Sequence, residues 1–214
     1  MKVAVYGAGG SAREVAWLAE SCMSQDGPYE VVCFIDDNQE KWGSVLNEIP
    51  VMGLEAAKLQ FPNARVVSGI GSPRIRQLTM EKAAAAGFSF ATLIHSAVEY
   101  SRFVEFGQGV TVCVGCILTT NIVLGEHVQI NVDCTISHDV VMGAFTTLAP
   151  GVHVPGAVHF GKRVLVGTGA VFINGKQERP LVIGDDAVVG AGACVTKPVK
   201  AGTTVAGVPA RLIK

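Results

Sequence analysis

Three consecutive side chains, Ser137, His138 and Asp139, have types that support proton transfer. An imidazole accepts and returns protons near neutral pH, so His138 is the side chain best suited to act as a general base. A neighbouring carboxylate can orient the ring and stabilise its protonated form. Neighbouring side chains of an extended strand point in opposite directions, however, so Asp139 can serve His138 only if the chain turns between them. The pair therefore predicts a catalytic base at a corner of the fold, with stronger support for His138 and Asp139 than for Ser137.

The region around this pair is built from a six-residue repeat. Apolar residues occupy every sixth position in an unbroken series: Phe106, Val112, Leu118, Leu124, Ile130, Ile136, Met142, Leu148, Val154, Phe160, Val166 and Phe172. Two residues before each of them stands a small or β-branched residue, and the series resumes at Ile183, Val189 and Val195. This repeat predicts a parallel β-helix, in which each six residues form one face of a triangular coil. The period is compatible with either hand of coiling.

Three faces make a coil of 18 residues, so residues 18 apart stack on one another. Gly156 and Asn174 are therefore expected above His138. The step from Phe172 to Ile183 is 11 residues, so five extra residues form a loop within 173–182 at the same corner. Loops on a rigid scaffold often carry function, and Lys176 and Arg179 of this loop are candidates to hold a phosphate.

Residues 1–90 follow a different pattern, in which apolar strands alternate with helices. Strands are expected at 2–6, 31–35 and 64–70, with helices at 12–22 and 73–86. This alternation predicts a small parallel sheet flanked by helices. We therefore expect a Rossmann-like α/β domain at 1–90 followed by the β-helix at 91–214.

Composition excludes several function classes. The chain of 214 residues is 49% hydrophobic and 16% charged, with a net charge of -1, so it lacks the basic surface of a nucleic-acid-binding protein. No apolar run approaches the roughly 20 residues that span a bilayer. The N-terminus shows no signal peptide, which predicts a cytoplasmic protein. The six cysteines are scattered, and Cys116 and Cys134 are expected to pack inside the coils as reduced thiols.

Three segments resemble one family over nearly the whole chain. They are VYGAGGSAREV near the N-terminus, NVDCTISHDVVMGAFTTLAPGVHVPGAVHFG at 131–161, and IGDDAVVGAGACVTKPVKAGTTVAGVPARLI at the C-terminus. They resemble the bacterial sugar O-acyltransferases, which include sialic acid O-acetyltransferases and N-acetyltransferases of UDP-, GDP- or dTDP-linked 4-amino-4,6-dideoxy sugars. The resemblance implies a left-handed β-helix, a homotrimer, and acetyl-CoA bound between neighbouring β-helices. It also implies that His138 is the general base.

The resemblance further implies where the two substrates bind. Substrate-binding residues are expected at Gly9, Gly10, Ser11, Asp36, Asp37, Gly71, Ser72, Arg76 and Asn131. Residues binding acetyl-CoA are expected at Thr147, Gly156, Gly167, Thr168, Gly190, Ala191 and Lys197, with the Gly156 N–H as an oxyanion donor. Many relatives have histidine where Thr147 and Ser11 stand. The glycine turn departs from a dinucleotide fingerprint because Ala12 occupies its last glycine position.

The predicted function is acetylation of the amino group of a nucleotide-linked 4-amino-4,6-dideoxy sugar for bacterial surface glycans. Two alternatives remain open: O-acetylation of sialic acid or another glycan hydroxyl, and a non-catalytic β-helix that binds a nucleotide sugar or a metal. A zinc site of three histidines is not expected, because no other histidine shares the column of His138. The four other histidines, at 95, 127, 153 and 159, are expected on the surface.

Overall fold

The computed structural model describes residues 1–24 and 27–214, which form two compact units, Met1–Ser96 and Ala97–Lys214. None of the helices in these residues is long and apolar enough to cross a bilayer, and α3 has only 13 residues.

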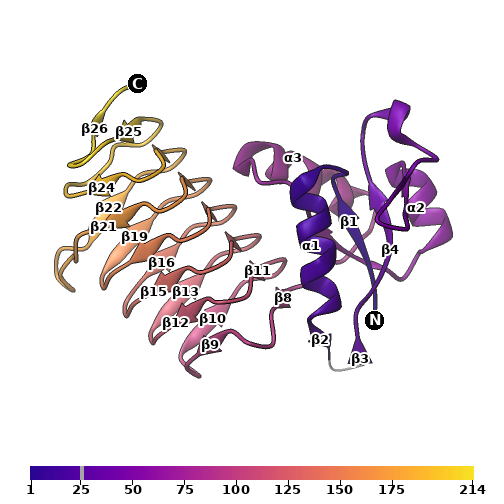
Figure 1. Cartoon of the computed structure of the whole chain (residues 1–214), viewed down its shortest axis with the longest axis horizontal. Coiled ribbons are helices and arrows are strands. Elements are labelled where there is room, and N and C mark those ends of the chain that lie inside the picture. Colours follow the sequence, from indigo (N-terminus) through magenta and orange to yellow (C-terminus); the bar gives the residue numbers. More distant parts are fainter. Residues whose placement is uncertain (25–26) are drawn as a thin grey trace. The chain divides into compact units, whose positions relative to one another are not determined.

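The first unit is an α/β fold around one mostly parallel sheet of strand order β5-β6-β4-β1-β7 (Figure 1). Its elements are β1 (Lys2–Tyr6), α1 (Gly10–Glu20), β2 (Met23–Ser24), β3 (Gly27–Pro28), β4 (Glu30–Ile35), η1 (Gln39–Lys41), β5 (Val45–Leu46), β6 (Ile49–Met52), α2 (Leu54–Gln60), β7 (Arg65–Ser68), α3 (Pro73–Ala85) and β8 (Leu93–Ile94). The three expected strands and two expected helices are present, and β6 and α2 extend the alternation by another strand and helix.

The order of these strands creates a switch point between β1 and β7. The chain proceeds outward from β1 to β4 and β6, then returns across the sheet to place β7 on the other side of β1. Right-handed crossovers in opposite directions place α1 and α2 on opposite faces of the sheet. Open α/β sheets bind ligands beyond the carboxyl ends of their strands at such a point.

The second unit is a left-handed parallel β-helix whose coils stack in sequence order from β9 to β25, and β26 pairs antiparallel with β25 at its C-terminal end (Figure 1). One face comprises β10 (Val104–Phe106), β13 (Ile122–Leu124), β16 (Val141–Met142), β19 (Val158–Phe160) and β22 (Leu181–Ile183). The next comprises β11 (Thr111–Val112), β14 (Gln129–Ile130), β17 (Thr147–Leu148), β20 (Leu165–Val166), β23 (Val188–Val189), β25 (Thr204–Ala206) and β26 (Arg211–Leu212). The third comprises β9 (Glu99–Tyr100), β12 (Ile117–Leu118), β15 (Thr135–Ile136), β18 (His153–Val154), β21 (Val171–Phe172) and β24 (Cys194–Val195). We call them face 1, face 2 and face 3.

Strand pairing confirms the six-residue register. Residues 18 apart are partners in successive coils, as in Thr135 with His153 and Val141 with His159. Pairs that span the insertion are 23 apart, as in Val158 with Leu181, which accounts for five added residues. The repeated apolar positions are buried except for the half-buried Phe106 of the first coil, and Cys116 and Cys134 are 1% and 0% exposed. Burial of each branched aliphatic side chain stabilises the stack by about 1.5–3 kcal/mol.

Most corners of the β-helix turn through a residue in the left-handed region of backbone space. At the corner from face 1 to face 2 these residues are Gly109, His127, Phe145, Arg163 and Asp186, stacked in one column. The His127 ring covers Gly109, where an added Cβ would lie within 2.2 Å of Nδ1, and it stacks on the ring of Phe145 with centroids 4.9 Å apart. The expectation that His127 lies on the surface is therefore wrong, since it is 4% exposed and packs as part of the column.

Candidate active site

His138 and Asp139 occupy the corner between β15 on face 3 and β16 on face 1. Asp139 has a φ of 59°, and this left-handed turn brings its carboxylate beside the preceding side chain instead of to the opposite side. Oδ2 of Asp139 lies 2.8 Å from Nδ1 of His138. Because the carboxylate holds Nδ1, the proton-accepting position of the ring is Nε2. The His138 side chain is 56% exposed, so a ligand can reach it.

Asn121, which the sequence analysis did not single out, completes this arrangement. It lies one coil below Asp139, and its Nδ2 donates a hydrogen bond of 3.4 Å to Oδ1. The hydrogen bond from His138 is the main cause that lowers the pKa of Asp139, and the bond from Asn121 and the nearby His159 lower it further. Asp139 is therefore a carboxylate at neutral pH, as required to orient His138. The sequence carries a signal for this contact, because positions 121 and 139 differ by one coil of 18 residues and are therefore expected to stack.

Gly156 lies directly above His138, as the register predicts. A Cβ at position 156 would lie 2.4 Å from Cε1 and 2.5 Å from Nε2 of the imidazole. The N–H of Ala157 donates to the His138 carbonyl at 3.0 Å, which fixes the two coils together. Only glycine leaves room for the ring in this position, so Gly156 sets where Nε2 is presented.

The insertion stands at the same corner, two coils above His138. The N–H of Gly175 donates to Gly156 O and the N–H of Leu181 to Ala157 O, each at 3.0 Å. Beside it lies a cavity of about 500 Å³, lined by Ile173, Asn174, Gly175, Lys176, Arg179, Pro180, Leu181, Thr196, Lys197 and Pro198. We call residues 137–140, 155–157, 173–181 and 196–198 the His138 corner.

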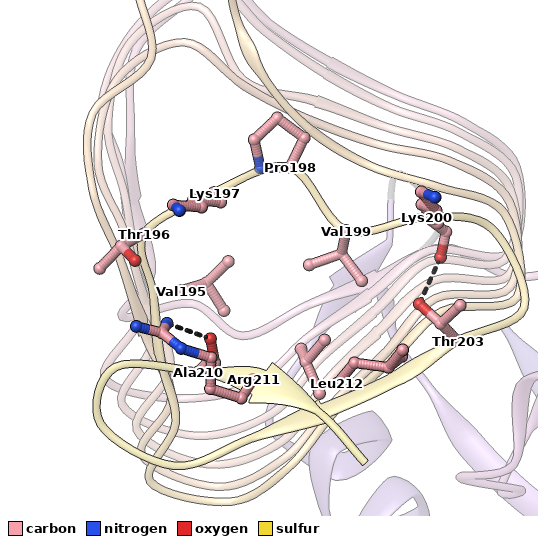
Figure 2. A pocket seen from close by; sticks show the side chains of 11 residues that line it. Val195, Thr196, Lys197, Pro198, Val199, Lys200, Thr203, Ala210, Arg211 and Leu212 are labelled. Atoms are coloured by element: carbon pink, nitrogen blue, oxygen red, sulfur yellow. Dashed lines mark hydrogen bonds between the residues drawn. The ribbon is translucent and has the colours of Figure 1, made fainter. Parts of the chain in front are cut away.

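A second cavity of about 320 Å³ lies at the C-terminal end of the β-helix and shares the wall Thr196–Pro198 with the first. Figure 2 shows it along the stacked coils, with Val195, Val199 and Leu212 on its apolar side. Lys197 and Lys200 stand on different sides of this last coil (Figure 2).

Other residues predicted to bind acetyl-CoA gather at a different corner, between face 2 and face 3. Gly167 packs beneath Gly190 and Ala191, where an added Cβ would lie 2.5 Å from the Ala191 nitrogen, and Gly192 N donates to Thr168 O at 2.8 Å. Asn131 belongs to the same corner two coils lower, and its Nδ2 donates to Leu148 O at 2.6 Å. We call residues 131, 149, 167–168 and 190–191 the Gly167 corner. Face 3 separates the Gly167 corner from the His138 corner.

Thr147 lies on face 2, half a coil away from His138, and is 3% exposed. The structure therefore does not bring Thr147 to the His138 corner within one chain. The predicted cofactor residues divide into three places: Gly156 and Lys197 with His138, four residues at the Gly167 corner, and Thr147 on face 2.

In the first unit, the predicted glycine turn and the end of β7 come together at the switch point. Helix α1 begins at Gly10 with Gly9 as its N-cap, so its N-terminal N–H groups face this edge. A Cβ on Gly71 would lie 3.8 Å from Oγ of Ser11, and Ser72 occupies the N-cap position of α3 without a side-chain capping hydrogen bond. These residues could hold an anionic ligand.

The departure at Ala12 also has a structural explanation. The last glycine of a dinucleotide fingerprint permits close packing of helix against strand. Here Gly69 provides that closeness from the strand side, since a Cβ on it would lie 2.5 Å from the Cα of Ala12.

The two carboxylates at the end of β4 each pair with a lysine of the same unit. Asp36 pairs with Lys41 at 2.8 Å. Burial raises the pKa of Asp37, but hydrogen bonds from Lys82 and Tyr6 outweigh it, so the net pKa is lowered. Both carboxylates are thus engaged within the unit.

The prediction that Arg76 contacts the ligand needs correction. Its side chain is 0% exposed, burial lowers its pKa to about 9, and it donates to Ile70 O and Gly71 O at 2.9 and 3.3 Å. Arg76 shapes the loop after β7 rather than presenting its charge to a ligand.

No group of three His, Cys, Asp or Glu side chains within 1–24 and 27–214 is arranged to hold a metal ion. An imidazole paired with a carboxylate, on an exposed corner beside open cavities, could accept a proton from a neutral nucleophile during acyl transfer.

Comparison with known proteins identifies the family. Residues 2–83 match the PglD N-terminal domain. GDP-perosamine N-acetyltransferase of Escherichia coli O157:H7 is 31% identical over 213 residues, which cover 98% of this chain and 95% of that protein.

Two solved structures are similar over almost their whole length. The acetyltransferase domain of PglB from Neisseria gonorrhoeae FA1090, in complex with acetyl coenzyme A, has a TM-score of 0.86 and 33% identity, covering 99% of this chain and 98% of that one. PerB from Caulobacter crescentus, in complex with CoA and GDP-perosamine, has a TM-score of 0.88 and 29% identity, covering 100% and 98%. Together with the fold and the His138 corner, these likenesses show that the chain is an acyltransferase of the PglD-like bacterial sugar O-acyltransferase family.

Proposed function

We propose that this enzyme transfers the acetyl group of acetyl-CoA to the amino group of a nucleotide-linked 4-amino-4,6-dideoxy sugar. The observation that carries the proposal is the His138–Asp139 pair, with its 2.8 Å hydrogen bond, on an exposed corner above which Gly156 leaves room for the ring. The acceptor class is supported by GDP-perosamine in the names of the E. coli relative and of the PerB complex.

His138 acts on the amine as it attacks the thioester carbonyl. Nε2 accepts the proton that the nitrogen loses as the new C–N bond forms, and Asp139 stabilises the resulting imidazolium. The Gly156 N–H donates to the oxyanion of the tetrahedral intermediate. When the C–S bond breaks, the imidazolium returns the proton to the departing thiolate, so the products are the amide and CoA with a free thiol.

The first domain, 1–90, binds the sugar nucleotide and the second, 91–214, performs acetyl transfer. The glycine turn Gly9–Ser11 and the Gly71–Ser72 loop approach the diphosphate, while Asp36 and Asp37 lie at the next strand end, where base or ribose would bind. Arg76 serves this site by fixing the Gly71 loop.

The functional assembly is a homotrimer with acetyl-CoA between neighbouring β-helices. The supporting observation is that the predicted CoA residues other than Thr147 lie on two corners separated by face 3, which one CoA could contact together only where two copies meet. We place the enzyme in the cytoplasm, where acetyl-CoA and sugar nucleotides are available, in the biosynthesis of surface glycans.

The test is a thiol-release assay with acetyl-CoA across UDP-, GDP- and dTDP-linked 4-amino sugars, with sialic acid as a hydroxyl acceptor. We expect turnover with one of the amino sugars and a loss of about 10²–10⁴-fold in kcat for His138→Ala. Near wild-type turnover of His138→Ala would refute the mechanism. Activity confined to the hydroxyl acceptor would instead establish O-acetylation.

A further inference from the structure

The five-residue insertion at the His138 corner forms a small hairpin with two cations on one side. Lys176 N donates to Arg179 O at 3.0 Å, and Arg179 N donates to Lys176 O at 2.9 Å. Residues paired directly across two antiparallel segments extend their side chains to the same side. Lys176 and Arg179 therefore project together.

A third cation comes from the last coil. Across the insertion the coil spacing is 23 residues, so Lys197 lies above Asn174 in the column that contains His138 and Gly156. Lys176, Arg179 and Lys197 all line the cavity of about 500 Å³, whose lining includes no carboxylate. Within the described residues, the three cations are exposed and none of them forms a salt bridge.

Hydrogen bonds and close backbone contact hold the hairpin at a fixed distance from His138 along the stack of coils. Its two ends are hydrogen-bonded to Gly156 and Ala157, and a Cβ on Gly175 would lie 2.0 Å from Ala157 O, so the backbone approaches the coil as closely as glycine permits. Coils are spaced by about 4.8 Å, which puts Lys197, three coils up, about 14 Å from the level of His138.

This distance along the stack matches the length of the pantetheine arm of CoA. The pantetheine arm between sulfur and the first phosphorus has about 13 bonds, slightly more than four residues' length of backbone, and extends to about 15 Å. A thioester held at His138 with its arm along the corner therefore brings the CoA diphosphate to the level of Lys197, one coil above the base of the hairpin.

We propose that Lys176, Arg179 and Lys197 form a binding site for the diphosphate of CoA. This inference rests on the proposed function. Charge-assisted hydrogen bonds from Arg and Lys to phosphate oxygens give the site its affinity, and the hairpin makes CoA a better donor than a thioester without phosphates.

The experiment compares acetyl-CoA with acetyl-pantetheine, which has the same reacting group and arm but no phosphate. For Lys176→Ala/Arg179→Ala we expect KM for acetyl-CoA to rise about 10- to 30-fold with kcat unchanged, as for the loss of two charge-assisted contacts. With acetyl-pantetheine, the variant and the wild type should have equal kcat/KM. Lys200→Ala is the matched control, because it removes a lysine from the same coil outside this cavity.

Three results would overturn the proposal. They are an equal loss with both donors, a rise in KM for the sugar nucleotide instead of acetyl-CoA, and an effect of Lys200→Ala as large as that of the double variant. Calorimetric titration of CoA into the wild type and the double variant, without acceptor, measures the site separately from turnover. Weakened CoA binding there supports the site even if no amino sugar proves to be a substrate, whereas unchanged binding refutes it.

Discussion

Substituting Gly156 by alanine tests whether the position of the imidazole, and not merely its presence, determines the rate. The new Cβ would lie 2.4 Å from Cε1 of His138, whereas ordinary van der Waals contact begins at 3.4 Å, so the ring must move by about 1 Å. The backbone at 156 does not have a positive φ, so alanine introduces no backbone strain there. The clash is therefore with a side chain that can move into solvent.

A displacement of about 1 Å at a reacting group costs on the order of 10²-fold in rate. That factor corresponds to about 2.7 kcal/mol of transition-state stabilisation. We expect kcat of Gly156→Ala to fall about 100-fold in the thiol-release assay, with KM for the sugar nucleotide unchanged. The melting temperature should change little, because the displaced ring is already 56% exposed.

A double-mutant cycle with His138→Ala separates this cause from the alternatives. Once the imidazole is removed, the Cβ at 156 has no ring to displace, so Gly156→Ala should cost nothing further. If the substitution costs the same 100-fold in both backgrounds, it obstructs acetyl-CoA or the oxyanion instead, and the argument about ring position is wrong.

Three further substitutions follow from individual contacts. Asn121→Ala removes the longer of the two hydrogen bonds to Asp139, so kcat should fall only a few-fold. Asp139→Asn should lower kcat about 10²-fold or more, because the imidazolium loses its carboxylate. Equal effects of the two variants on kcat would contradict this order. Lys82→Met should destabilise the protein by at most about 1 kcal/mol at neutral pH, since the pair with Asp37 is exposed. Because the folded-state pKa of Asp37 is lowered, this difference in unfolding free energy should disappear as the pH falls below the ordinary value of 3.8 and through the folded-state value, and a difference that persists in acid would refute the pairing. Gly69→Ala should destabilise the first unit by more than about 2 kcal/mol in a denaturant titration, because its Cβ meets the backbone of α1, and a wild-type midpoint would contradict the close packing.

The β-helix was predictable in detail because its signal is repeated. The register of twelve apolar positions alone predicts Gly156 above His138 and places the insertion at the same corner. The small sheet of the first unit was less predictable. Strand β6 and helix α2 are short and lack a repeated pattern, so neighbouring elements rather than local periodicity determine them.

The direction of individual side chains could not be predicted from the sequence. The contact between His138 and Asp139 depends on a φ of 59° at a non-glycine residue, a conformation that recurs at most corners of the coil. The full burial of Arg76 likewise depends on tertiary packing, since an arginine after a strand end is by sequence equally suited to bind an anion. Packing against Phe145 decided the place of His127 in the same way.

Six of the seven predicted CoA residues are divided between two corners, which leads to a complementation test. If each site joins the His138 corner of one copy to the Gly167 corner of its neighbour, two variants that are inactive alone should restore one another when mixed. His138→Ala removes the base, and Ala191→Trp fills the other corner at an exposed position. In randomly mixed trimers about a quarter of the sites pair an intact His138 corner with an intact neighbouring Gly167 corner, so about a quarter of wild-type kcat should return. If one copy supplied both corners to a site, every site would carry one defect, and no mixture of the two variants would recover activity.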